Sequence, residues 1–166
     1  MTSDPRANPD STRPVPGAAN LGVARPPLVY ASSIALGVLL QFARPVLLLP
    51  GASPLFGAGV LLLAIGLFLF AVRTFRAAGT PVPGNRPTTK IVRTGPYRFS
   101  RNPIYLAFSL LQLGIAVWVN SLWLVITLIA AVVVMSLVVI PREEQYLEAR
   151  FPSEYSPYKA SVRRWF

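Results

Sequence analysis

The chain has 166 residues, of which 53 % are hydrophobic and only 13 % are charged, and its mean hydropathy is +0.51. It contains neither cysteine nor histidine, which excludes disulfide bonds, thiolate nucleophiles and histidine-ligated metal sites, so we expect no metal. The 16 Lys and Arg residues outnumber the 6 Asp and Glu residues and give a net charge of +10, but they alternate with long apolar stretches. This pattern favours an anionic bilayer over nucleic acid as the partner and predicts an integral membrane protein.

Residues 1–27 hold six prolines and few apolar side chains. Such a segment buries too little surface to offset its conformational entropy, so we predict a disordered N-terminal tail. The first apolar stretch begins at Leu28, and no small-residue cleavage site follows a short hydrophobic core. We therefore expect the first helix to stay in the membrane and residues 28–166 to form one membrane domain.

Four apolar stretches predict four transmembrane helices. The clearest covers residues 55–72, which are 18 uncharged residues or about 27 Å of helix, close to the thickness of a hydrocarbon core. Residues 104–140 carry no charge over 37 positions, too many for one span, and Asn120 and Ser121 predict a turn between two interfacial tryptophans. Pro141 is expected to end the last span. The fold class is therefore all-α and polytopic, with predicted spans at about 28–49, 55–73, 104–119 and 122–140.

The basic residues lie on one side of these predicted spans. The connections at 50–54 and 120–121 are uncharged, whereas the loop at 74–103 and the tail at 141–166 are rich in arginine. By the positive-inside rule we expect this loop, this tail and both termini on the cytoplasmic side of a bacterial-type inner or plasma membrane. A loop this long in so small a protein is typical of a functional or a disordered segment.

The loop leads into the sequence TGPYRFSRNPIY, residues 94–105. Gly95 and Pro96 predict a turn, and Pro103 suits the first turn of the following helix. The backbone amides at that helix start, with Arg101 nearby, are suited to hold a carboxylate or another anionic group. The simpler alternative is that the arginines of the loop bind lipid phosphates at the interface.

The tail opens with the sequence PREEQYLEARF. Glu143 and Glu144 predict the start of a short amphipathic helix in which Tyr146, Leu147 and Phe151 face the bilayer. Acidic residues in a first helical turn are favourable through the helix dipole alone. The preceding 132 residues contain no Asp or Glu, however, so the pair is unusual in this chain. Beside an arginine-rich loop, it is suited to a zwitterionic or cationic ligand such as S-adenosylmethionine.

Residues 73–166 resemble the isoprenylcysteine carboxyl methyltransferase and phospholipid methyltransferase group of integral membrane enzymes. Two motifs carry the resemblance, TGPYRFSRNPIYL at 94–106 and EEQYLEARFPSEYSPYKASVRRW at 143–165, with a predicted helical hairpin between them. The resemblance implies an S-adenosylmethionine-dependent methyltransferase with S-adenosylhomocysteine as a product. It implies a cytoplasmic cofactor-binding loop, a cofactor held between the two motifs, and a lipophilic substrate that enters from the bilayer.

The same resemblance implies roles for individual residues. The cofactor-binding positions are Gly95, Pro96, Tyr97, Arg101, Asn102, Pro103, Tyr105, Glu143 and Glu144. The tail residues that cover the pocket are Tyr155, Tyr158 and Arg163. Arg73 or Arg76, where the second helix leaves the membrane, corresponds to an arginine at the reaction centre of the family. Asn102 stands where many members have histidine, and its amide keeps the hydrogen bonding without a titratable group.

Two functions follow as alternatives. The first is a membrane methyltransferase that transfers a methyl group to a carboxylate, amine or thiol of a lipophilic acceptor. The second is a non-enzymatic membrane module, a transporter subunit or an assembly factor, whose basic loop binds anionic lipid. Gly57, Gly59 and Gly66 in the second helix are expected to serve helix packing, in a monomer or a weak homodimer.

Overall fold

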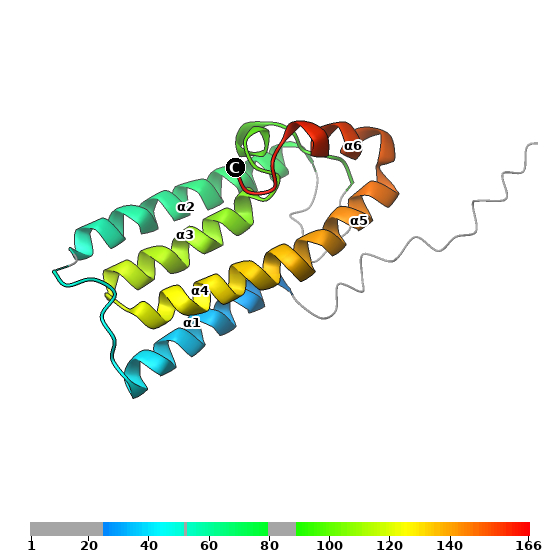
Figure 1. Ribbon diagram of the computed structural model, residues 1–166. Helices are drawn as coiled ribbons and strands as arrows, with labels where there is room; N and C mark the ends of the chain where they lie inside the picture. Colours follow the sequence, from blue (N-terminus) through cyan, green and yellow to red (C-terminus); the bar gives the residue numbers. More distant parts are fainter. Residues whose placement is uncertain (1–24, 52, 80–88) are drawn as a thin grey trace, which may run out of the picture.

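The computed structural model describes residues 25–51, 53–79 and 89–166, and within these ranges it holds no strand beyond an isolated bridge between Leu47 and Ser121. The predicted all-α fold is confirmed. Figure 1 shows a bundle of long helices lying side by side and a smaller cap at one end of this bundle. The bundle contains α1 (Pro26–Ala43), α2 (Pro54–Ala77), α3 (Pro103–Trp118) and α4 (Leu122–Val134), and the cap contains η3 (Gly95–Arg98), α5 (Ile140–Arg150) and α6 (Pro152–Ser161).

Among the described residues, three helical stretches are long and apolar enough to cross a membrane, namely α1, α2 and the continuous helix Leu122–Arg150. Helix α3 is also apolar, but its 16 residues span only about 24 Å. It lies between α2 and α4 and packs against both (Figure 1). Large apolar side chains such as Leu55 and Phe56 are exposed on the outside of the bundle, where lipid rather than water is the matching solvent. The chain is an integral membrane protein.

The helical domain starts two residues earlier than predicted. Residues 1–24 of the predicted tail lie outside the described residues. Helix α1 begins at Pro26, and Pro27 occupies its first turn, where the missing N–H of proline costs no hydrogen bond. The last prolines of the predicted tail therefore start the helix.

The first helix also ends earlier than predicted. It stops at Ala43, whereas the predicted span extends to about residue 49. Pro45 disfavours helical backbone at the residue before it, and Arg44 has φ −147° and ψ 89°. The residues that follow bond to the turn between α3 and α4 instead, because the Asn120 side chain accepts hydrogen bonds from the backbone N–H groups of Leu48 at 3.1 Å and Leu49 at 2.9 Å.

The helix that contains the fourth predicted span continues past Pro141, where the span was predicted to end. The chain stays helical from Leu122 to Arg150, and a π-helical segment, η4 (Met135–Val139), precedes the proline. The wider π turn accommodates a residue that lacks a backbone N–H, since the bonding pattern shifts locally and the Ile140 N–H bonds to the Met135 carbonyl. The rod that crosses the bundle therefore continues into the cap and carries the acidic pair with it (Figure 1).

A buried amide ties α1 to the rest of the bundle. The Gln112 side chain on α3 is fully buried. Its Oε1 accepts a hydrogen bond from Ser33 of α1 at 2.7 Å, and its Nε2 lies 3.2 Å from both the Leu124 carbonyl and the Thr127 hydroxyl of α4. In an apolar environment each of these polar groups needs a partner, so the cluster fixes the relative placement of three helices.

One of the three glycines expected to serve packing does so directly. A Cβ built on Gly57 would lie 2.5 Å from the Trp118 backbone nitrogen and 2.9 Å from the Gly114 carbonyl oxygen, so α2 and α3 approach backbone to backbone there. Gly59 and Gly66 have no atom within 4 Å of such a Cβ. The close packing of α2 on α3 therefore depends on Gly57.

This difference gives a matched pair of variants on one helix. We expect Gly57→Ala to lower the free energy of unfolding by about 1–3 kcal/mol, because backbone cannot move away from the new methyl group as a side chain does. Gly59→Ala should leave it unchanged or raise it by up to about 1 kcal/mol through helix propensity. Thermal unfolding of the purified protein in detergent measures both, and equal effects of the two variants would contradict the packing described.

Candidate functional site

A pocket lies in the cap, where α2 ends and α3 begins. It encloses about 680 Å³ including its open mouth, and both sequence motifs contribute to its walls. The lining residues are Phe75, Lys90, Ile91, Val92, Tyr97, Arg101, Asn102, Pro103, Ile104, Tyr105, Ile140, Glu143, Glu144, Leu147, Tyr155 and Tyr158. Segments separated by about forty residues of helical hairpin thus meet around one cavity.

Arg101 is the most unusual group in this pocket. Only 9 % of its side chain is exposed, and its one ion pair within the described residues joins Nη2 to Glu144 Oε1 at 3.2 Å. Its Nε and Nη1 are buried and have no hydrogen-bond partner there. A buried donor without a partner costs about 1–3 kcal/mol, and more when it is charged. The pocket therefore presents a guanidinium whose bonding is incomplete.

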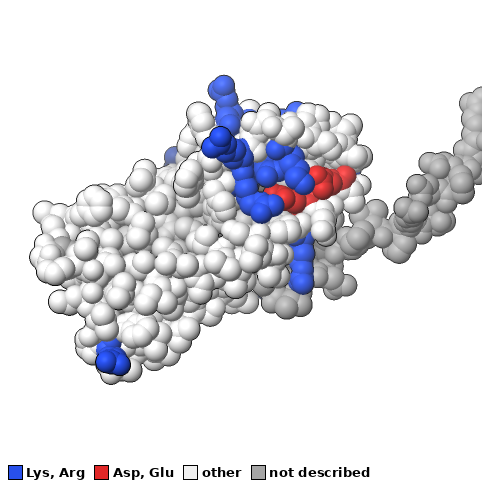
Figure 2. Space-filling view, viewed as in Figure 1, with Lys and Arg blue, Asp and Glu red and all other residues white. Residues whose placement is uncertain are grey.

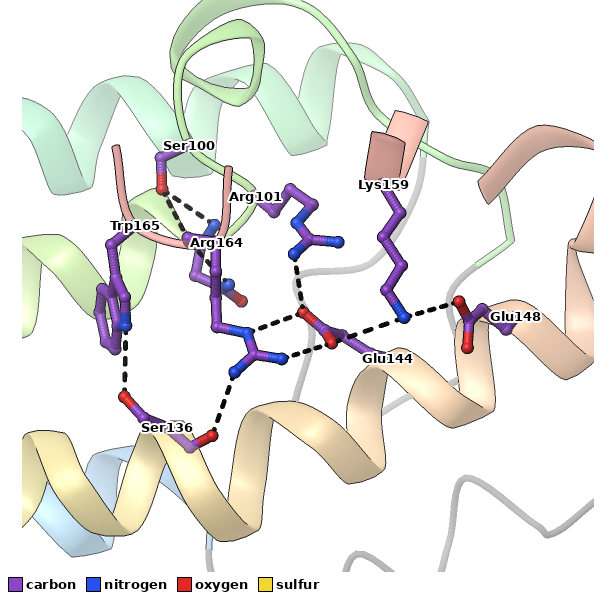
Figure 3. A network of polar contacts seen from close by, with 9 residues as sticks. Ser100, Arg101, Ser136, Glu144, Glu148, Lys159, Arg164 and Trp165 are labelled. Atoms are coloured by element: carbon purple, nitrogen blue, oxygen red, sulfur yellow. Dashed lines mark hydrogen bonds and ion pairs between the residues drawn. The ribbon is translucent and has the colours of Figure 1, made fainter. Parts of the chain in front are cut away.

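Glu144 is the centre of an ionic cluster. It is 5 % exposed, and Arg164 chelates it, with Nε 3.0 Å from Oε1 and Nη2 2.8 Å from Oε2. Lys159 Nζ lies 3.9 Å from the same carboxylate and 2.7 Å from Glu148. Figure 3 shows Arg101, Lys159 and Arg164 reaching Glu144 from different elements. The hydrogen bond to Glu144 raises the pKa of Arg164, so that guanidinium stays charged.

The last residues of the chain, 162–166, form a segment that we name the C-terminal strap. It runs beside the loop before α3, because the Arg164 carbonyl accepts hydrogen bonds from Ser100 Oγ at 3.3 Å and Asn102 Nδ2 at 3.0 Å. Its other contacts reach the π-helical segment, where Trp165 Nε1 donates to Ser136 Oγ at 3.2 Å and Arg164 Nη1 to the Ser136 carbonyl at 3.3 Å. The strap therefore holds the loop against the long helix.

Tyrosine hydroxyls supply further polar groups of the pocket. Tyr105 donates to Glu143 Oε2 at 2.8 Å, and Tyr158 donates to the Tyr97 carbonyl at 2.8 Å. The Tyr97 hydroxyl is buried without a partner among the described residues. Burial raises the pKa of Tyr158 to about 12 and moves the pKa of Tyr97 further in the same direction, so both phenols stay protonated at neutral pH. Their O–H groups are donors rather than bases.

The exposed basic residues gather over the same end of the molecule. Figure 2 shows Lys and Arg side chains over the cap, beside the acidic residues, and the apolar body of the bundle largely free of charge on this face. Exposed examples are Arg73 and Arg76 at the end of α2 and Arg93, Arg98 and Arg142 in the cap. The asymmetry predicted from the sequence is therefore present in space, with the pocket at the basic end.

The structure brings together most, but not all, of the predicted site residues. Those that line the pocket are Tyr97, Arg101, Asn102, Pro103, Tyr105, Glu143, Glu144, Tyr155 and Tyr158. Gly95 and Pro96 lie behind this wall, and Gly95, with φ 58°, packs so closely on Thr74 of α2 that a Cβ would lie 2.7 Å from its Oγ1. Arg73 and Arg76 are exposed and do not line the pocket.

Arg163 is exposed, and it contacts the loop through its backbone. Its carbonyl accepts a hydrogen bond from the Arg101 N–H at 3.0 Å. The neighbouring Arg164 holds Glu144 instead. The Arg163 side chain is exposed, whereas the Arg164 side chain reaches inward to the Glu144 carboxylate. The sequence shows two adjacent arginines, and only the register of the strap decides which one faces inward.

Sequence reasoning missed the apolar half of the pocket. Ile91 and Val92, just before the first motif, and Ile104, within it, line the pocket. As apolar residues they carry no sequence signal of a binding site. Leu147 was expected to face the bilayer and lines the pocket instead, since it lies one turn after Glu143 and Glu144 on the same face of α5.

A sequence model of the phospholipid methyltransferase family matches residues 53–154, more than half of the chain. The chain belongs to the phospholipid methyltransferase family. The family resemblance drawn from the two motifs is thereby confirmed. Over 62 residues the chain is 37 % identical to an uncharacterized protein of Haemophilus influenzae, a match that covers 37 % of this chain and 98 % of that relative. No solved structure matches this chain.

Membership in the phospholipid methyltransferase family assigns the protein to the membrane methyltransferases. It does not favour the alternative of a non-enzymatic membrane module. The matched residues extend from the start of α2 into α6 and contain every pocket residue except Tyr155 and Tyr158. Helix α1 and the C-terminal strap lie outside the match.

The ionic cluster predicts a large effect of Glu144→Gln. Removing the charge leaves Arg101 and Arg164 without a carboxylate in a buried setting, and we expect a loss of stability of at least about 2 kcal/mol. Trypsin should then cleave the tail faster, because the strap loses its ionic anchor. Thermal unfolding and timed proteolysis in detergent measure the two effects.

Glu148→Gln is the matched control for that variant. Glu148 pairs with the same Lys159, but its side chain is 38 % exposed, so its loss should cost about 0–1 kcal/mol. If the two variants lost the same stability, the central role of Glu144 would be refuted.

Proposed function

We propose that this protein transfers the methyl group of S-adenosylmethionine to a carboxylate, amine or thiol of a lipophilic acceptor that reaches the pocket from the bilayer. One observation carries the proposal. A buried Arg101 with two unpartnered nitrogens faces a cavity that also contains Glu143 and Glu144, in a chain of the phospholipid methyltransferase family.

The residues present fit the groups of this cofactor. A ligand carboxylate supplies the acceptor that Arg101 Nε and Nη1 lack. Glu143, which takes one hydrogen bond from Tyr105, has further lone pairs for an ammonium group or ribose hydroxyls. The apolar side chains of Ile91 and Val92 offer a surface for a flat base. The remaining predicted binding positions, Gly95, Pro96, Asn102 and Pro103, shape the loop around it.

The chemistry requires alignment and the exclusion of water more than acid or base groups. When bound, S-adenosylmethionine supplies a methyl group on a sulfonium, which an acceptor displaces in line. The chain itself binds and orients the reactants. In this proposal Tyr155 and Tyr158 of α6 cover the pocket, the strap closes its edge with Arg163 contributing its backbone carbonyl, and the protonated tyrosines donate hydrogen bonds without taking protons.

The acceptor side of the proposal involves Arg73 and Arg76. Both are exposed at the end of α2, and Phe75 between them lines the pocket. They are therefore placed to pair with an anionic group of a membrane-held acceptor beside the pocket mouth. The proposal also takes α3 as a fourth span and the cap as cytoplasmic, in a bacterial-type inner membrane, with the protein a monomer or a weak homodimer.

Cofactor binding is the first test. We expect the purified protein in detergent to bind S-adenosylmethionine and S-adenosylhomocysteine. Arg101→Met should weaken both affinities at least tenfold, which is about the contribution of one charge-assisted hydrogen bond. Arg150→Ala, which removes an exposed arginine at the end of α5, should leave both affinities unchanged. Isothermal titration calorimetry measures them. Absence of binding to folded wild-type protein at millimolar ligand would refute the proposed function.

The acceptor arginines give a separate test. Arg73→Ala and Arg76→Ala should raise the KM for an anionic lipophilic acceptor, by about tenfold if one charged hydrogen bond is lost, while the Kd of S-adenosylhomocysteine stays at its wild-type value. Methyl transfer to acceptors in mixed micelles, alongside calorimetry, separates the two quantities. A loss of cofactor affinity with an unchanged KM would show that these arginines do not act on the acceptor.

A further inference from the structure

The C-terminal strap places a second arginine on the carboxylate that Arg101 uses. We infer that Arg164 is a positioning residue for the cofactor site: by chelating Glu144, it keeps Arg101 Nε and Nη1 free for a ligand carboxylate. The inference rests on the proposed function and goes beyond it, because it assigns a role in ligand selectivity to a residue that lies outside both the pocket lining and the family match.

The geometry at Glu144 supports these separate roles for Arg164 and Arg101. Arg164 takes both carboxylate oxygens, at 3.0 and 2.8 Å, in the bidentate arrangement that a planar guanidinium prefers. Arg101 reaches only Oε1, through Nη2 alone, at 3.2 Å. Its other two nitrogens remain buried without a partner in the described part of the chain. Arg101 thus makes the weaker, one-point contact of the two.

Without the Arg164 side chain, this arrangement has no reason to persist. Glu144 would be a buried carboxylate with one oxygen uncovered, and Arg101 would gain by turning to chelate it, because two charge-assisted hydrogen bonds replace one. Lys159 is a poor substitute, since it lies 3.9 Å from Glu144 and 2.7 Å from Glu148. Arg101 would then donate to Glu144 the hydrogen bonds that a ligand carboxylate requires from it.

The side chain of Arg164 can be removed without detaching the strap. The backbone carbonyl of Arg164 accepts from Ser100 and Asn102, and the Arg163 carbonyl accepts from the Arg101 N–H. Trp165 adds its own bond to Ser136. All four contacts survive truncation at position 164, so the effect of the side chain on Arg101 is separable from the attachment of the strap.

Two ligands that differ only in the carboxylate test the inference. We expect wild-type protein in detergent to bind S-adenosylmethionine at least about tenfold more tightly than decarboxylated S-adenosylmethionine. In Arg164→Ala this preference should fall to about twofold or less, with the affinity for the decarboxylated ligand nearly unchanged. Arg142→Ala, which removes an exposed arginine of α5, should keep the wild-type preference. Calorimetry with both ligands measures each ratio.

Two more variants keep the test decisive if Arg164→Ala unfolds. Arg164→Lys retains the charge but loses the bidentate contact, and it should show an intermediate preference. The double variant Glu144→Gln with Arg164→Ala removes the carboxylate toward which Arg101 would turn. Its preference for S-adenosylmethionine over the decarboxylated ligand should therefore be larger than that of Arg164→Ala.

The outcomes separate this inference from the function on which it rests. A wild-type protein that prefers the carboxylate, with an Arg164→Ala variant that weakens both ligands equally, would overturn the positioning role and leave the proposed function intact. A folded wild-type protein that binds neither ligand would overturn both.

Discussion

The ion pairs of Glu144 join three other parts of the chain to the long helix that carries it. Arg101 comes from the loop before α3, Lys159 from α6 and Arg164 from the strap, while Glu144 belongs to the long helix that crosses the bundle. Glu144 is buried, so separating these charges is costly. Together with the hydrogen bonds of the strap, these charges hold loop, tail and helix around the pocket.

The continuity of α4 into α5 fixes where that cluster stands. A break at Pro141 would have left the acidic pair on a separate helix with its own freedom of orientation. The π-helical segment absorbs the proline, so Glu143 and Glu144 stay in register with the membrane-embedded part of the rod. The same segment presents the Ser136 carbonyl to Arg164. One local irregularity thus keeps the carboxylates in place and anchors the strap that covers them.

The long apolar stretches were enough to predict the four helices of the bundle, and the acid-poor background was enough to single out Glu143 and Glu144, because both signals are local in sequence. How these segments pack against one another could not be predicted in the same way. Whether Arg163 or Arg164 faces inward depends on how the strap lies against the loop. The inward direction of Leu147 and the pocket-lining role of Val92 depend on how α5 and the segment before η3 meet α3. The continuation through Pro141 depends on a backbone irregularity that no residue type demands.

In the function proposed above, loop and tail form opposite walls of a single ligand site. Hydrogen–deuterium exchange of the full chain in detergent, with and without S-adenosylhomocysteine, tests it most directly. Slower exchange on ligand addition, in residues 91–105 and in residues 143–161 together, is the predicted result. Protection confined to one of the two segments, or to neither, would contradict it.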